Sequence, residues 1–197
     1  MLCAAEPGFT SLFNGKDLTG WTLVAKKGGG YSVQDGAIVC ANGGGGNLLT
    51  DKDYDNFVLR LEFKLPPGGN SGIGLRAPLT GDVAYSGMEI QVLDQDNEKY
   101  KGVLKPWQHN GSLYNVFPAT ADALKPVGQW NQEEITANGP NIKVVLNGKT
   151  ILDADISTVK DPAVLKKHPG LQRTTGRIGF LGHNDPVAFR NIRIKPL

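Results

Sequence analysis

The chain has 197 residues, of which 40% are apolar and 20% charged, and its 21 Lys and Arg against 19 Asp and Glu give a formal charge of +2. This length fits one domain whose core needs no disulfide or metal, the balanced charge leaves no basic excess for nucleic-acid phosphates, and no apolar stretch approaches the ~18 residues of a membrane span. Glycine is nearly doubled, at 26 residues where ordinary usage gives about 14, which favours a turn-rich, all-β protein.

The first residues are similar to the end of a secretory signal. Small residues lead to Ala5, and a polar, proline-containing stretch follows it, so cleavage is expected after Ala5. We therefore expect residues 1–5 to be a signal-peptide remnant, residues 6–197 to form a single domain, and the protein to be secreted or periplasmic. Cys3 and Cys40 leave two alternatives open: a disulfide between them, or a buried Cys40 that packs as a small apolar residue.

Apolar and polar residues alternate along the chain with a period of two, which is the period of a β-strand. The clearest example is 57–65, where every second residue is Phe or Leu. Asp35-Gly36 and Asn147-Gly148 lie between alternating runs, and each pair predicts a hairpin turn. In chain order, strands are expected at both ends of 33–39, and at 57–65, 73–77, 88–92, 112–117, 132–137, 142–146, 150–153, 176–182 and 187–194.

Two segments lack this alternation. Residues 94–110 are polar and predict a long loop, whereas 157–175 contains Asp161 followed by Pro162, which predicts a short helical turn over 161–167. Short strands at this density, separated by Gly, Pro, Asn and Asp, indicate an all-β sandwich or barrel.

Strand alternation also separates the expected core from one polar sheet face. When the apolar residues point inward, the opposite face gathers five side chains: Arg76, Glu89, Gln91, His183 and Arg190. Gly72 and Gly74 lie among them, and glycine within a strand makes room for a close approach. Such a face suits a sugar, with Tyr100, Trp107 and Tyr114 as aromatic platforms. The alternative is the solvated outer face that any antiparallel sheet has.

Longer motifs span nearly the whole chain. They begin with Phe-Thr-Ser-Leu-Phe-Asn-Gly-Lys-Asp-Leu-Thr-Gly-Trp at 9–21 and end with Phe-Arg-Asn-Ile-Arg at 189–193. Between these two lie motifs at 57–62, 70–76, 86–91 with Asp94, 111–114, 128–131, 146–148, and 176–180 with His183. In the content and order of these motifs the chain resembles the 3-keto-disaccharide hydrolase domain family.

This resemblance implies a fold, a source and an activity. The fold is a concanavalin A-like jelly-roll sandwich of two antiparallel sheets with a sugar-binding face. The proteins of the family are typically exported by environmental or gut bacteria. The activity is cleavage of the glycosidic bond in sugars that are oxidised at C3, such as 3-keto-glucosides and 3-keto-disaccharides. The chain departs from the family pattern at one place. Relatives commonly carry a Gln before a His-Gly pair, and Leu181-Gly182-His183 has no such Gln here.

The spacing Glu89-x-Gln91-x-x-Asp94 is similar to the Glu-x-Asp-x-x-Glu strand of laminarinase-type glycosidases. A β-bulge after Gln91 would bring Asp94 to the same face as Glu89. However, Gln91 stands where those enzymes have a carboxylate, so ordinary two-carboxylate hydrolysis lacks a partner. An ordinary glucanase is therefore disfavoured.

A 3-keto sugar offers a different route, because the ketone acidifies the hydrogen at C2. One base can remove that proton, the enolate then expels the group at C1, and water adds to the product. We expect Glu89 to be the base, or else a metal ligand, and His183 to be a second acid or base. Arg76 is expected to clamp the enolate oxygen with its guanidinium group.

Substrate-binding roles are expected for five further side chains: Gln91, Asp94, Tyr114, Trp107 and Arg190. No metal site or cofactor is predicted, and a divalent cation near Glu89 and Asp94 is left open. The expected partner is an oligosaccharide or glycoside, with no nucleic acid and no membrane span.

Two alternatives stay open at this point. The same face fits a non-catalytic carbohydrate-binding module, which would tolerate loss of Glu89 and His183 but would depend on Tyr114 or Trp107. His183 taken alone also fits a structural histidine at the end of a strand.

Overall fold

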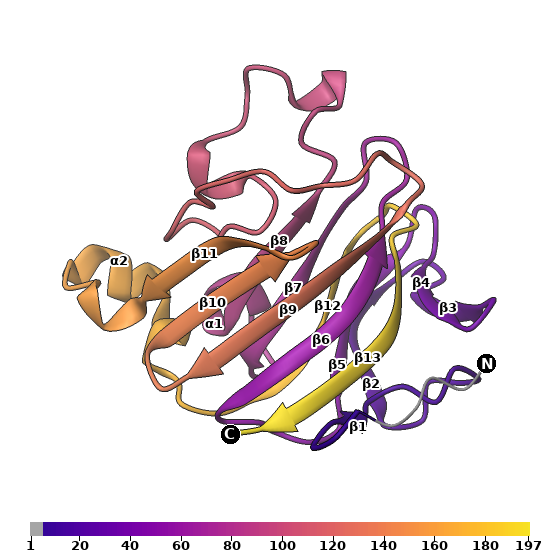
Figure 1. The fold of residues 1–197 in the computed structure, drawn as a ribbon, viewed down its shortest axis with the longest axis horizontal. Coiled ribbons are helices and arrows are strands. Elements are labelled where there is room, and N and C mark those ends of the chain that lie inside the picture. Colours follow the sequence, from indigo (N-terminus) through magenta and orange to yellow (C-terminus); the bar gives the residue numbers. More distant parts are fainter. Residues whose placement is uncertain (1–5) are drawn as a thin grey trace.

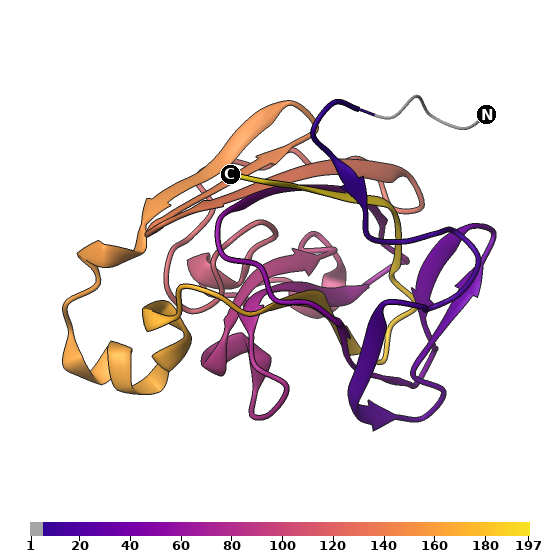
Figure 2. The ribbon, with the colours of Figure 1, turned by 90° about the horizontal axis from the view of Figure 1, so that it is seen from below.

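Two antiparallel β-sheets pack face to face, and the computed structural model describes residues 6–197 (Figures 1 and 2). The larger sheet has the order β11 (Lys149–Asp155), β10 (Asn141–Leu146), β9 (Trp130–Asn138), β6 (Phe57–Lys64), β13 (Ala188–Pro196), β4 (Ala37–Cys40) and β3 (Tyr31–Gln34), with β1 (Thr10–Ser11) paired to β13. The smaller sheet has the order β2 (Trp21–Lys27), β5 (Gly45–Thr50), β12 (Arg177–His183), β7 (Asn70–Ala77) and β8 (Met88–Leu93). The predicted all-β sandwich of two antiparallel sheets is therefore confirmed.

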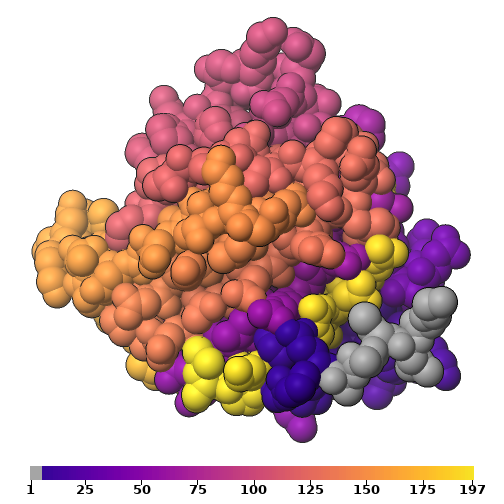
Figure 3. Space-filling model, in the orientation of Figure 1, coloured from indigo at the N-terminus to yellow at the C-terminus, as the bar shows by residue number. Residues whose placement is uncertain are grey.

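Helical structure is confined to short pieces between the strands. The two α-helices are α1 (Val83–Ser86) and α2 (Pro162–Lys167). The 3₁₀ turns are η1 (Glu98–Tyr100), η2 (Pro106–Gln108), η3 (Ile156–Thr158) and η4 (Pro169–Gln172). Residues 94–109, which follow β8, extend beyond one end of the sandwich and are pink in Figures 1 and 3.

The core lies between the two sheets. In β6 every second residue from Phe57 to Phe63 is buried, and the residues between them are partly exposed. Phe180 of β12 stacks on Phe189 of β13 with ring centroids 3.9 Å apart, so one aromatic pair joins the smaller sheet to the larger one. Burial of apolar surface between the layers is the main force that holds them together.

The turn signals in the sequence are confirmed. Asp35 and Gly36 both have positive φ values, of 49° and 72°, and Asn147 and Gly148 have φ values of 50° and 84°, as a tight hairpin of this hand requires. The helix α2 begins as expected, because the side chain of Asp161 accepts a hydrogen bond from the first turn.

Other elements differ from the sequence prediction. The strands β1, β2 and β5 and the four-residue helix α1 were not expected. The strand predicted at 112–117 is wrong, since Leu113 forms only isolated bridges, to Ile90 and Phe117. The chain at 110–114 instead follows the outer edge of β8, where its amide and carbonyl groups pair with those of Glu89 and Gln91.

The predicted signal remnant at 1–5, together with Cys3, lies outside the described residues. Cys40 is buried, as one of the two alternatives expected, and this burial raises the pKa of its thiol to about 11. Within residues 6–197 no helix is long and apolar enough to cross a membrane.

Candidate functional site

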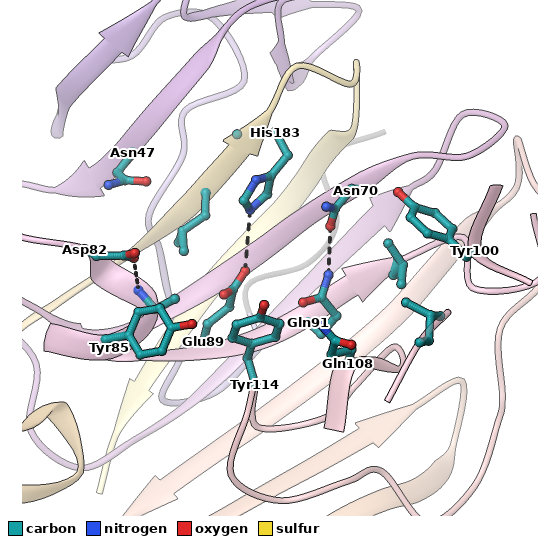
Figure 4. A pocket seen from close by; sticks show the side chains of 15 residues that line it. Asn47, Asn70, Asp82, Tyr85, Glu89, Gln91, Tyr100, Gln108, Tyr114 and His183 are labelled. Carbon is teal, nitrogen blue, oxygen red and sulfur yellow. Dashed lines mark hydrogen bonds and ion pairs between the residues drawn. The ribbon is translucent and has the colours of Figure 1, made fainter. Parts of the chain in front are cut away.

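A cavity of about 370 Å³ lies on the outer face of the smaller sheet, away from the larger one (Figure 4). Its floor comes from β5, β7, β8 and β12, and its walls come from α1 and from the segment between β8 and β9. The lining residues are Asn47, Asn70, Asp82, Ala84, Tyr85, Glu89, Gln91, Leu93, Tyr100, Leu104, Gln108, Tyr114, Leu181, Gly182 and His183.

Strand alternation places the two central polar residues of β8 in this cavity. Met88 and Ile90 point into the core, so Glu89 and Gln91 point the other way. Across the ladder they face two glycines, because Gly74 pairs with Glu89 and Gly72 pairs with Gln91. A Cβ atom on Gly72 would overlap Oε1 of Glu89, so the carboxylate occupies the space that a side chain would take there.

Glu89 and His183 form the electrostatic centre of the site. Only 3% of the Glu89 side chain is exposed, and Oε1 lies 3.9 Å from Nε2 of His183, beyond hydrogen-bond length. Burial raises the pKa of Glu89, His183 partly opposes that rise, and the nearby carboxylate of Asp82 adds to it. Oε1 of Glu89 has no hydrogen-bond partner in the described structure. A buried carboxylate with a raised pKa and a free oxygen is suited to accept a proton from a bound molecule.

The polar groups around Glu89 are held in fixed orientations. Nε2 of Gln91 donates to Oδ1 of Asn70 at 2.8 Å, which leaves the Gln91 carbonyl oxygen directed elsewhere. The Tyr114 ring meets the Tyr85 ring edge-on, with centroids 6.3 Å apart. Figure 4 shows both of these rings beside Glu89, with Asn70 and Gln91 further along the cavity. Amide groups and aromatic rings in one cleft are the usual partners of sugar hydroxyls and pyranose faces.

Four of the eight site residues predicted from the sequence meet in this cavity. They are Glu89, Gln91, Tyr114 and His183, and the aromatic candidate Tyr100 lines it as well. The other four lie elsewhere, each for a different reason: Arg76, Asp94, Trp107 and Arg190.

Arg76 does not face the cavity, so the prediction that it shares a face with Glu89 is wrong. Its φ of 49° and a register shift between β7 and β12 form a bulge that ends the regular alternation. The guanidinium group is buried and donates to three backbone carbonyls, those of Asp55, Gly139 and Arg173. Arg76 therefore ties loops together at another part of the molecule.

Asp94 and Arg190 also have other partners. No bulge interrupts the pairing of β8 with β7 as far as Leu93, so Asp94 does not turn toward Glu89, and its Oδ2 accepts the backbone N–H of Gly68 at 2.7 Å. Arg190 does point outward, but from β13 in the larger sheet, where its Nε donates to Glu62 at 2.7 Å. Both predictions of a place in this cavity are wrong.

Trp107 lies beside the cavity and not in its wall. It belongs to η2 and is 39% exposed, while its neighbours Leu104 and Gln108 do line the cavity. Of the two aromatic platforms predicted in this loop, Tyr100 therefore lines the cavity and Trp107 does not.

Several residues that line the cavity were not predicted from the sequence. Asn70 shares the strand phase of Gly72 and Gly74, so the alternation of β7 contained the signal for it. Asp82 and Tyr85 lie at α1, which is too short to show any periodicity.

Groups that could hold a metal ion are few. Among residues 6–197, no three His, Cys, Asp or Glu side chains come together in an arrangement fit for a metal ion. Glu89 and Asp94, between which a cation was left open, do not share the cavity.

The known proteins to which this chain is similar agree with one another in what they are named for. The sequence model of a family described as the 3-keto-alpha-glucoside-1,2-lyase-like domain matches residues 8–195. A 3-keto-disaccharide hydrolase of Bacteroides thetaiotaomicron is 29% identical, over 96% of this chain and 79% of its own length. A crystal structure of a candidate glycosyl hydrolase from Parabacteroides distasonis has a TM-score of 0.81 at 31% identity and covers 96% of this chain and 99% of that one. A second from the same organism has a TM-score of 0.79 at 29% identity, with coverages of 96% and 94%.

Proposed function

We propose, from the premise that the chain belongs to the family of 3-keto-alpha-glucoside-1,2-lyase-like domains, that it cleaves the glycosidic bond of 3-keto-glucosides or 3-keto-disaccharides. The proposed route is proton abstraction at C2, elimination and hydration. The family description and the name of the Bacteroides relative support the substrate class.

One observation carries the proposed chemistry: Glu89 is a buried carboxylate with a raised pKa and a free oxygen, and His183 lies 3.9 Å away. A carboxylate in such surroundings is a stronger base than one in water, because burial disfavours its charged form. His183 is 46% exposed, so it can exchange protons with solvent. The pair thus provides a base inside the cavity and an acid at its opening.

The reaction balances in three steps. Glu89 takes the proton from C2, and the electron pair forms an enolate with the C3 ketone. The enolate collapses to re-form the ketone and a C1=C2 double bond, while the C1–O bond breaks and the imidazolium of His183 protonates the departing oxygen. Water then adds its hydroxyl to C1 and a proton to C2, which yields the free 3-keto sugar and an alcohol. Gln91 and Tyr114 bind the sugar in this scheme.

The test uses a 3-keto-glucoside in D₂O, with and without a chelator. Elimination and hydration place one deuterium at C2 of the released sugar, whereas direct hydrolysis leaves C2 unlabelled. A reaction without enzyme corrects for spontaneous exchange next to the ketone. Turnover without deuterium would overturn the route, and absence of turnover in both arms would favour a non-catalytic carbohydrate-binding module.

Export is proposed as well. The small residues before Ala5 support a secreted or periplasmic protein. This proposal is tested by expressing the precursor in a bacterium, fractionating the cells, and looking for the protein in the medium or the periplasm.

A further inference from the structure

The proposed reaction needs a hydrogen-bond donor for the enolate oxygen. Negative charge gathers on the C3 oxygen when Glu89 removes the C2 proton, and a fixed donor at that oxygen lowers the barrier. No Lys or Arg lines the described cavity, and Arg76 is bound to backbone carbonyls elsewhere. Among the side chains that line the cavity, the remaining hydrogen-bond donors are imidazole, amide and tyrosine hydroxyl groups.

Of the three tyrosines that line the cavity, Tyr100 and Tyr85 have hydroxyl groups held by a hydrogen bond within the protein, and these two differ in where the hydroxyl proton goes. The hydroxyl of Tyr100 donates to the carbonyl of Gly68 at 3.2 Å, so its proton is committed to the backbone. The hydroxyl oxygen of Tyr85, by contrast, accepts a hydrogen bond from Nδ2 of Asn115 at 3.0 Å. Since Nδ2 is a donor and cannot accept, the proton of Tyr85 remains free to point into the cavity.

Tyr85 is also fixed in place from outside the cavity. The imidazole of His168, which is buried, packs on its ring with centroids 4.8 Å apart, and the ammonium of Lys167 lies 5.5 Å from the ring centre. Both residues come from the end of α2, far away in the sequence. A donor that is held before substrate binds needs no reorganisation during the reaction.

Tyr85 and Glu89 line the same cavity. Figure 4 shows its hydroxyl directed toward the side of the cavity that holds Glu89. The C3 oxygen is attached to the carbon next to C2, so a base at C2 and a donor at the C3 oxygen must lie close together in one cavity. Tyrosine hydroxyls act as oxyanion donors in enzymes that form enolates.

We infer that Tyr85 is a catalytic residue that donates its hydroxyl hydrogen bond to the C3 enolate oxygen, and that Asn115 is a positioning residue that directs this proton. The inference rests on the proposed function. It assigns to Tyr85 the role that the sequence analysis gave to Arg76.

The experiment compares four proteins on one 3-keto-glucoside, with hydrogen or deuterium at C2. They are the wild type, Tyr85→Phe, Asn115→Asp and the control Tyr54→Phe, which loses the same hydroxyl outside the cavity. Tyr85→Phe is expected to lower kcat by about 10²–10³-fold, as loss of one oxyanion donor does, with little change in KM and a larger isotope effect. Asn115→Asp is expected to cause a similar loss, because an aspartate oxygen would accept the Tyr85 proton and turn it away from the cavity.

Each outcome has one meaning. A Tyr85→Phe variant with kcat within about threefold of the wild type overturns the inference while the proposed function stands. A reduced kcat with an unchanged isotope effect also overturns it, because a partly unfolded protein would behave in that way. A wild type without turnover overturns the proposed function itself.

Discussion

Oε1 of Glu89 lies 3.9 Å from Nε2 of His183, and the two side chains differ sharply in exposure, at 3% and 46%. The buried carboxylate has a raised pKa because burial disfavours its charge, and the histidine limits that rise. Burial therefore has the largest influence on the pKa of this base, and the half-exposed imidazole lowers that pKa in part.

His183→Ala is expected to move the acidic limb of the pH profile of kcat/KM to higher pH. Loss of the imidazole removes the interaction that lowers the pKa of Glu89, so a higher pH is needed to deprotonate this base. The profile is measured on the residual activity of the variant. His109→Ala, which changes a histidine outside the cavity, serves as the control; a limb that stays in place in His183→Ala would contradict the coupling.

Glu89→Gln is expected to lower kcat by about 10²–10⁴-fold, the range for loss of a general base. The variant should unfold at the wild-type temperature or above, because a buried carboxylate without a hydrogen bond on Oε1 is replaced by a neutral amide. Glu62→Gln is the matched control, since Glu62 pairs with Arg190 on the other sheet. Near wild-type cleavage by Glu89→Gln would remove Glu89 from the mechanism.

Gly72→Ala is expected to lower kcat by roughly 10²-fold or more, because small displacements of a catalytic group cost that much. A Cβ atom at Gly72 would overlap the Glu89 carboxylate and force it to move. In Gly74→Ala the new methyl group would meet Val83 and Leu181 instead, so the effect on kcat should be smaller. Equal losses in the two variants would show that crowding of β7, and not the place of the carboxylate, limits activity.

Glu133→Gln is expected to stabilise the protein increasingly as pH rises from about 5 to 8. Glu133 lies between the buried Leu61 and Leu146 of neighbouring strands, neither of its carboxylate oxygens has a partner, and burial raises its pKa to about 8 from the ordinary 4.5. The folded protein keeps the proton while the unfolded chain releases it, so wild-type stability falls by about 1.4 kcal/mol per pH unit over this window, approaching about 5 kcal/mol in total.

Denaturant unfolding at several pH values measures this difference. The two proteins should have similar stabilities near pH 4, where the carboxyl is protonated in both states. Glu134→Gln is the control, because this neighbour is partly exposed and pairs with Arg60. A constant gap between wild type and Glu133→Gln at all pH values would contradict the raised pKa.

Arg76→Met is expected to lower the free energy of unfolding by roughly 2 kcal/mol, because it removes the hydrogen bonds of a charged donor to three backbone carbonyls. The kcat of the folded variant should match the wild type, since Arg76 reaches the carbonyls of Gly139 and Arg173 and not the cavity. Stability and kcat are measured on the same preparation. A large fall in kcat with stability retained would restore the role that the sequence analysis gave to Arg76.

The sequence predicted the sandwich and the centre of its site because both depend on strand alternation. Glu89 and Gln91 were found from the period-two pattern of β8, which the structure keeps without interruption. The same rule failed at Arg76, where a bulge breaks the pattern. It gave the right direction for Arg190 but could not say to which of the two sheets that strand belongs.

The residues that form the walls of the cavity could not be predicted from strand alternation. Tyr85 and Gln108 lie on single helical turns in irregular segments, whose course depends on contacts distant in sequence. The contact between Tyr85 and His168 joins residues more than eighty positions apart, and no local pattern contains it.

The segment that extends beyond the sandwich after β8 has a consequence for evolution. The base Glu89 lies on a strand, whereas Tyr100, Leu104 and Gln108 reach the same cavity from this one continuous insertion. Substitutions within residues 94–109 would therefore reshape one wall of the cavity, while the reacting groups on the sheet stay in place.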